Sequence, residues 1–223
     1  MTSFWFVEAA LLAAVAVSQS GAAQKPPASL EMGGKKSVTR FFITSRGLGK
    51  GGNLGGLAGA DAHCQALAKA EGSGDHTWRA YLSTMATSTS PAVNARDRIG
   101  KGPWYNALGD RISINLQQLH TDGGNKISVE NAVTERGDTV EFEDHDILTG
   151  SRADGTSYPG TGDLTCANWT SSGRGRAQVG HFDRMGQDAG QRSWNSAHAT
   201  RGCSQQDFRA TGGSGLFYCF AVD

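Results

Sequence analysis

The stretch GADAHCQALAKAEGSGDHTWRAYLS, residues 59–83, predicts a helix that is followed directly by a strand. Over 60–71, apolar residues recur at helical spacing and can line one face, at Ala60, Cys64, Leu67 and Ala68. Asp61 lies in the expected first turn, where a carboxylate suits the helix dipole, and Gly72 ends the helix. Over 77–83, apolar residues alternate as in a half-buried strand, at Trp78, Ala80 and Leu82.

Short β-prone segments and turn signals flank this stretch on both sides. Residues 38–44 (VTRFFIT) predict the first strand, and residues 94–99 a short second helix. Further strands are expected at 112–119, 178–182 and 216–222. The 31 glycines have no collagen-like period and indicate many turns and loops. One or two helices followed by short strands and long loops predict the α+β class.

Composition and charge place the chain among globular proteins. Of its 223 residues, 38% are hydrophobic and 19% charged, and its formal net charge is zero. A nucleic-acid-binding protein usually has a strong basic excess, so this function is not expected.

The N-terminus has the pattern of an exported protein. An apolar run at 9–17 is followed by small residues, which predicts a signal peptide over 1–23 with cleavage after Ala22 or Ala23. Residues 24–37 contain prolines, glycines and lysines and predict a flexible linker, so the folded domain is expected at 38–223. No later segment is apolar enough to cross a membrane, and we expect a secreted or periplasmic protein.

Four cysteines, all beyond the predicted leader, fit the same compartment. They are Cys64, Cys166, Cys203 and Cys219. No two of them form a CxxC pair, so neither a zinc knuckle nor a thioredoxin-type motif is expected. In an exported chain four cysteines imply two disulfides, and the sequence leaves all three connectivities open.

Several segments, in one order, resemble the endostatin domain of certain collagens. Gly59 to Gln65 followed by Trp78 to Ser83 is similar to its helix-and-strand core, 148–155 to one of its turns, and Cys166-Ala167-Asn168-Trp169 to its second cysteine segment. The resemblance extends to the last strand, with Phe217-Tyr218-Cys219-Phe220. It implies a C-type-lectin-like (endostatin-like) fold, with one or two helices packed on short, mostly antiparallel strands joined by long loops. It also implies two nested disulfides, Cys64 with Cys219 and Cys166 with Cys203.

Metal sites known from lectins and endostatin are not expected. The segment Trp194-Asn195-Ser196 lacks the aspartate of a calcium-type lectin, and no histidine precedes His63, where endostatin binds zinc. A divalent cation remains an alternative at an acidic stretch that includes His145: Glu135, Asp138, Glu141, Glu143, Asp144 and Asp146. In His181-Phe182-Asp183 the carboxylate could orient the imidazole, although a surface or capping role is the simpler interpretation.

Nothing in the sequence indicates an enzyme or a cofactor. A nucleophile elbow is absent, and the cysteines are expected in disulfides. The predicted function is a secreted, non-enzymatic module that recognises carbohydrate, a polyanion or a protein partner through its long loops. Its predicted ligand contacts are Arg174, Arg176, Arg192 and Asn195. The alternatives are a structural or assembly module of the cell envelope or matrix, and a cryptic hydrolase on the same scaffold.

Overall fold

The computed structural model describes residues 1–2 and 36–223, and residues 36–223 belong to one compact unit. Apart from its first two residues, the leader predicted over 1–23 lies outside the described residues, as does the linker up to residue 35. Within the described residues, no helix is both long and apolar enough to cross a bilayer.

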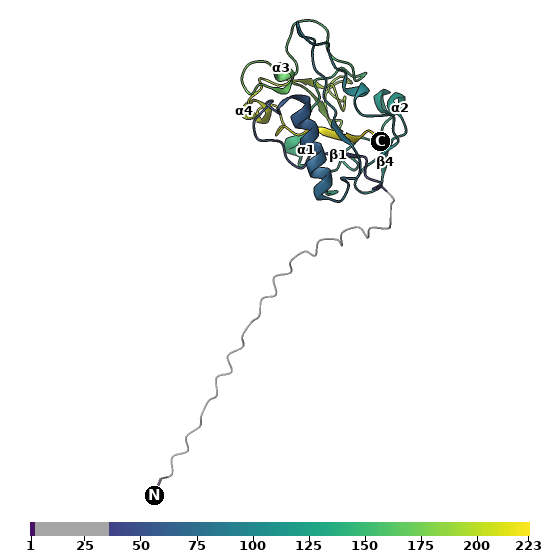
Figure 1. Cartoon of the computed structure of the whole chain (residues 1–223). Coiled ribbons are helices and arrows are strands. Elements are labelled where there is room, and N and C mark those ends of the chain that lie inside the picture. The colour runs from purple at the N-terminus through teal and green to yellow at the C-terminus, as the bar shows by residue number, and fades with distance from the viewer. Residues whose placement is uncertain (3–35) are drawn as a thin grey trace. The chain divides into compact units, whose positions relative to one another are not determined.

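The described chain is a mixed α+β structure with short elements and long connections (Figure 1). The helices are α1 (Gly56–Ala70), α2 (Leu116–His120), α3 (Cys166–Trp169) and α4 (Gln205–Arg209), with short 3₁₀ turns at Ala95–Asp97 and Phe142–Asp144. The strands are β1 (Phe41–Ile43), β2 (Trp78–Ala80), β3 (Trp104–Tyr105), β4 (Arg111–Ser113), β5 (Asp146–Leu148), β6 (Gln178–His181), β7 (His198–Ala199) and β8 (Tyr218–Ala221). The predicted α+β class is confirmed.

The central sheet is built around the last strand, β8. Its order is β1-β8-β2, and both neighbours run antiparallel to β8. Because side chains alternate across a strand, Cys219 and Ala221 enter one core while Tyr218 and Phe220 enter the other. Every residue of β8 is buried, so the sheet lies between two apolar layers.

Helix α1 covers one face of this sheet. Its buried residues Ala60, Cys64 and Leu67 pack in the same core as Trp78 of β2 and Cys219 of β8. Cys64 and Cys219 form a disulfide, with their Cα atoms 5.7 Å apart. The bond therefore ties the first helix to the last strand, in the pairing that the resemblance implies.

The second disulfide, Cys166–Cys203, joins two loop segments whose Cα atoms are 5.6 Å apart. The short element α3 that begins at Cys166 is a left-handed turn, with φ between 49° and 68° at all four residues. A Cβ at Gly52 would lie 2.5 Å from Cys166 Cβ, so the loop at 47–56 needs a glycine where it crosses this disulfide.

Three sequence predictions need correction. The short helix expected over 94–99 is only a 3₁₀ turn at Ala95–Asp97. Helix α1 begins at Gly56 rather than at residue 60, so Asp61 lies beyond the first turn. The strand predicted over 112–119 is divided between β4 and α2, because the Asn115 side chain accepts a hydrogen bond from the Gln118 amide and starts a helix there.

Asp61 forms an ion-pair network instead of interacting with a helix end. Its carboxylate accepts hydrogen bonds from Arg98 Nη2 at 2.7 and 2.9 Å and from Arg79 Nη1 at 2.9 Å. It also accepts the amide of Ala80 in β2 at 2.9 Å. The carboxylate therefore joins α1 to β2 and to the loop at Arg98.

We expect Asp61→Ala to lower the free energy of unfolding by about 3 kcal/mol, because it leaves the mostly buried Arg98 guanidinium without its carboxylate. Denaturant unfolding measures the change, and the exposed Asp138→Ala is the control, with an expected change within about 0.5 kcal/mol. Equal midpoints for the two variants would contradict a stabilising role of Asp61.

Candidate metal centre

Three histidines and one aspartate meet at one end of the sheet β5-β6-β7. Strand register pairs Asp146 with His181 directly, and pairs His198 with Val179, two residues from His181. Cross-strand neighbours lie on the same face of a sheet, so these side chains are brought together by strand pairing. His145, just before β5, completes the group, which we call the His–Asp centre: His145, Asp146, His181 and His198.

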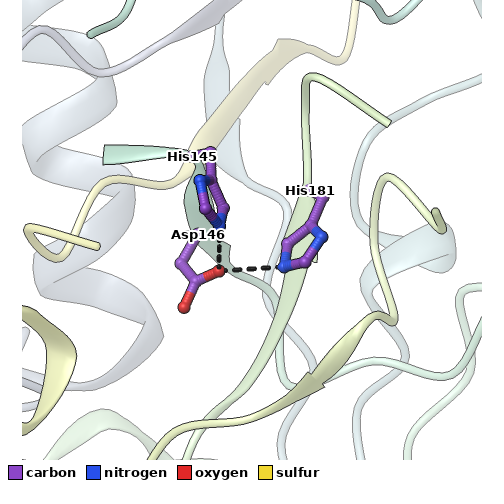
Figure 2. A group of neighbouring side chains, drawn as sticks. All are labelled: His145, Asp146 and His181. Atoms are coloured by element: carbon purple, nitrogen blue, oxygen red, sulfur yellow. Dashed lines mark ion pairs between the residues drawn. The ribbon is translucent and has the colours of Figure 1, made fainter. Parts of the chain in front are cut away.

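Asp146 Oδ1 is the point on which the three imidazoles converge. Its distances to the Nε2 atoms are 3.4 Å for His145, 3.0 Å for His181 and 3.2 Å for His198. The Nε2 atoms of His181 and His198 lie 2.9 Å apart. Figure 2 shows the rings of His145 and His181 directed at this carboxylate oxygen.

The other nitrogen of each ring faces a backbone carbonyl. Nδ1 of His145 lies 3.0 Å from the carbonyl oxygen of Phe142, and Nδ1 of His181 lies 2.7 Å from that of Met185. Nδ1 of His198 lies 3.3 Å from the carbonyl oxygen of Ala199. A carbonyl oxygen only accepts, so these contacts favour a proton on Nδ1 and leave Nε2 of a neutral ring with a lone pair. This is the arrangement of metal-ligating histidines. The 2.9 Å hydrogen bond between the Nε2 atoms of His181 and His198 needs a second proton on one of these two rings, which a bound ion would replace.

The carboxylate at the middle of the centre is buried and poorly compensated. Asp146 is 2% exposed, and neither of its oxygens has a partner aligned as a hydrogen bond. The close imidazole nitrogens are therefore within contact distance of Oδ1 but do not satisfy it. Asp183 Oδ2, 4.0 Å from His145 Nδ1, is also buried without a hydrogen-bond partner. Buried carboxylate oxygens of this kind are costly unless a cation lies beside them.

The pKa values of these groups depend on one another. Burial alone would raise the pKa of Asp146, but His181 and His198 outweigh burial and hold that pKa below its usual value. Burial lowers the pKa of His181, but Asp146 outweighs it and the net shift is upward. The contact with Asp146 is the main reason that the pKa of His198 is raised. The centre thus favours added positive charge, either as a proton or as a metal ion.

The donor set and spacing fit zinc better than calcium. Zn²⁺ takes imidazole nitrogen and carboxylate oxygen at about 2.0–2.1 Å in tetrahedral geometry, which places ligand atoms about 3.3 Å from one another. Four of the six ligand-atom distances are 2.9–3.4 Å and close to this value: those from Asp146 Oδ1 to the three Nε2 atoms, and the one between His181 and His198. The ligand atoms of His145, Asp146 and His181 all lie within 4.8 Å of one another, and His198 falls outside this group. Ca²⁺ prefers six to eight oxygens, and the centre offers one carboxylate.

Two glycines allow the last long loop to close against the centre. A Cβ at Gly212 would lie 3.0 Å from His145 Nε2, and one at Gly213 would lie 2.8 Å from Asp146 Cβ. Gly212 also has a φ of 103°, which residues with side chains rarely adopt. The amide of Asp146 donates to the Gly212 carbonyl at 2.9 Å, so this turn holds β5 in place.

The centre draws on some residues that the sequence singled out. His145 and Asp146 belong to the acidic stretch considered as a cation site, and His181 to the segment His181-Phe182-Asp183. The rest of the acidic stretch does not join them: Glu135 accepts from Ser45, and Asp138, Glu141 and Glu143 are exposed. His198 was not expected as a ligand, because only the pairing of β7 with β6 brings it to the group.

The four predicted ligand contacts do not form one site. Asn195 is 1% exposed, and its Nδ2 donates to Tyr81 Oη at 2.9 Å and to two loop carbonyls at 3.2 Å. Its side chain thus has no surface for a ligand. Arg174 and Arg176 are exposed, and Arg176 lines one pocket while Arg192 lines another.

No protein-family model matches the chain, and no curated protein matches its sequence.

Proposed function

We propose that the chain is a non-enzymatic, zinc-binding recognition module of the C-type-lectin-like class. Zinc is held by the His–Asp centre, and the ligand, a carbohydrate or a polyanionic or protein partner, is bound by the long loops. The observation that carries the proposal is the convergence of three imidazole Nε2 atoms on the buried, unsatisfied Asp146 Oδ1.

The fourth ligand decides whether the ion is structural. His145, Asp146 and His181 are the three residues whose ligand atoms all lie within 4.8 Å of one another, and His198 Nε2 lies 3.2 Å from Asp146 Oδ1 and 2.9 Å from His181 Nε2. If the His198 ring turns toward the ion, four protein ligands fill the tetrahedral positions, and a filled site does not activate water. The proposed binding module uses the ion in this way, whereas a hydrolase would keep the position of His198 open for water.

The position of the centre indicates what zinc would do. His181 ends β6 and His198 begins β7, so one ion would join both ends of the loop at 182–197. Fastening the ends of a loop removes conformational freedom and makes its surface more defined. The proposed ion would therefore fix the ends of a recognition loop, just as the disulfide Cys166–Cys203 fixes the two loops that it joins.

The fold assignment and the compartment are part of the proposal. Short antiparallel strands, long loops and a disulfide from the first helix to the last strand support a C-type-lectin-like, endostatin-like domain. Two disulfides and no membrane-spanning helix among the described residues fit an extracellular or periplasmic protein. The proposed zinc centre is not the N-terminal zinc site of endostatin, because the ligands of the proposed centre lie in β5, β6 and β7 and next to them.

Metal titration tests the zinc centre directly. We expect the tag-free, chelator-treated chain to bind one Zn²⁺ in calorimetry, unaffected by millimolar Ca²⁺. With Co²⁺ in place of zinc we expect the intense visible absorption of a tetrahedral ion. His63→Ala is the matched control, because the His63 ring contacts the Arg46 carbonyl and is outside the centre. Failure to bind zinc would identify the centre as a proton-stabilised ion cluster and contradict the proposal.

Ligand recognition needs a separate test. We expect the zinc-loaded chain to bind a subset of immobilised glycans, and chelation to weaken that binding. Zinc binding without any glycan signal, together with retention of envelope or matrix proteins, would favour the assembly module instead. Turnover of a glycoside or ester substrate by the zinc-loaded chain, lost in Asp146→Asn and retained in His198→Ala, would favour the hydrolase.

A further inference from the structure

A second group of charged residues, outside the His–Asp centre, lines a pocket of about 430 Å³. Two segments form it: residues 122–131, which follow α2, and the loop between β6 and β7. Its charged side chains are three cations against one carboxylate: Lys126, Arg184 and Arg192, with Asp122. The chain as a whole has zero net charge, so this pocket is a local concentration of positive charge.

Arg184 is the central cation of the pocket. Its Nε donates to the Ile127 carbonyl at 3.0 Å and its Nη2 to Asn125 Oδ1 at 2.5 Å. Both acceptors are neutral, so they orient the guanidinium without balancing its charge. Among the described residues, no carboxylate lies within 4.0 Å of Arg184, Lys126 or Arg192. The Arg184 Nη1 donates to no protein group in the described chain.

The burial of Arg184 makes the missing counter-charge significant. The residue is only partly exposed, so its guanidinium has lost part of its contact with water. Arg184 also has a φ of 60°, in the left-handed region that costs a residue with a side chain about 1 kcal/mol or more. A partly buried cation is thus held in a strained conformation, with donors left for a partner that the described chain does not supply. Guanidinium groups of this kind bind oxyanions through paired, charge-assisted hydrogen bonds.

We propose that this pocket binds an oxyanion group, a carboxylate, sulfate or phosphate, carried by a small ligand of monosaccharide size. Arg184 donates to the oxyanion from Nη1, and Lys126 and Arg192 add charge at the rim. A volume of about 430 Å³ is far larger than one inorganic anion and lies in the usual range for small-molecule sites. The inference names the ligand chemistry of the proposed recognition module and rests on that binding function, but it does not require zinc.

Four hexoses that differ mainly in one substituent provide the probes. Glucuronate, glucose 6-phosphate and N-acetylglucosamine 6-sulfate carry the three oxyanions, and glucose carries none. In ¹H–¹⁵N NMR titrations of the whole chain, we expect saturable shifts at residues 122–131 and 184 with at least one acidic sugar and none with glucose. The strongest acidic sugar identifies the oxyanion. Added NaCl should weaken the binding, because salt screens the rim charges.

Charge-removing variants test the assignment of residues. Lys126 and Arg192 are exposed, so Lys126→Gln and Arg192→Gln keep the fold, and each should weaken binding about fivefold. Arg184→Gln should abolish saturable binding. Arg184 also donates hydrogen bonds to residues 125 and 127, so the NMR spectrum of Arg184→Gln is first compared with that of the wild type. If the spectrum shows a changed fold, the test rests on the two rim variants. Arg174→Gln, an exposed arginine outside the pocket, should bind like the wild type.

The outcomes separate this inference from the zinc proposal. Each titration is run on zinc-loaded and on chelated protein. Absence of shifts at the pocket in both forms contradicts the oxyanion site, whatever the zinc titration gives. Binding only to long sulfated chains, weakened equally by Arg174→Gln and Lys126→Gln, would also overturn it and would indicate a diffuse surface interaction. Shifts at the pocket in a chain that binds no zinc would support this site and contradict only the zinc proposal.

Discussion

Replacing Asp146 by asparagine is expected to weaken zinc binding at least about a hundredfold, which is the largest effect on zinc affinity that we predict. The substitution keeps the size of the side chain but replaces the charged carboxylate on which three imidazoles converge by a neutral amide, a much weaker zinc ligand. Even residues that only support metal ligands cost about 10- to 100-fold in affinity when mutated, so losing a ligand should cost at least as much. Calorimetric titration of the chelated variant with Zn²⁺ measures the change.

Thermal unfolding of the same variant distinguishes zinc from a proton-stabilised cluster. Zinc at a hundred times its dissociation constant should stabilise the wild type by about 2.7 kcal/mol and leave Asp146→Asn unchanged. In the chelated state Asp146→Asn should unfold more easily than the wild type, because His181 and His198 stabilise the charged carboxylate and hold its pKa below its usual value. Glu143→Gln, an exposed acid in the same segment, is the control and should respond to zinc like the wild type. A variant that is destabilised without metal, beside a wild type that ignores zinc, would identify a protonated ion cluster.

Three elements, α1, β1 and β8, could be predicted from local sequence patterns alone. The helical spacing of Ala60, Cys64 and Leu67 predicted α1, and the β-rich run at 38–44 and the apolar end at 216–222 predicted β1 and β8. The start of α1 was placed too late, because glycines at 56 and 59 lower helix propensity while the structure extends the helix through them. At 112–119, the apolar pattern favours a longer strand, but the Asn115 side chain caps the N-terminus of α2 and a helix begins there instead.

The site was less predictable than the fold, because its residues are distant in sequence. His145 and Asp146 are adjacent, but His181 and His198 reach them only through the register of β5 with β6 and of β6 with β7. No i,i+4 spacing or paired motif in the sequence indicates such a site. For Asn195 the error was the reverse, because the sequence predicted a ligand contact that the structure does not place at the surface. Its polar side chain hydrogen-bonds to Tyr81 and to two carbonyls inside the molecule. For Arg184, no sequence pattern indicated its burial or its missing carboxylate partner.

The disulfide Cys64–Cys219 is expected to make the largest covalent contribution to stability. It closes a loop with a sequence separation of 155 residues, against 37 for Cys166–Cys203. In the chain-entropy model the penalty for breaking a cross-link grows with the logarithm of loop length, giving about 5 kcal/mol for the first bond and about 4 kcal/mol for the second. All four cysteines are fully buried, so paired alanine substitutions leave a similar cavity of two sulfur atoms at each bond, and this cost largely cancels when the two pairs are compared.

We therefore expect Cys64→Ala/Cys219→Ala to lose about 1 kcal/mol more than Cys166→Ala/Cys203→Ala, which serves as its matched comparison. Guanidinium unfolding of the zinc-free proteins measures both, so that the metal does not mask the difference. Removing the first bond is also expected to disturb the folded structure more than removing the second. The first bond is the covalent link between α1 and the central strand β8, whereas the second joins loops at the edge of the same core. If the second pair proved the more costly, loop entropy would not be the main source of the stabilisation, and packing around the left-handed turn at Cys166 would have to outweigh it.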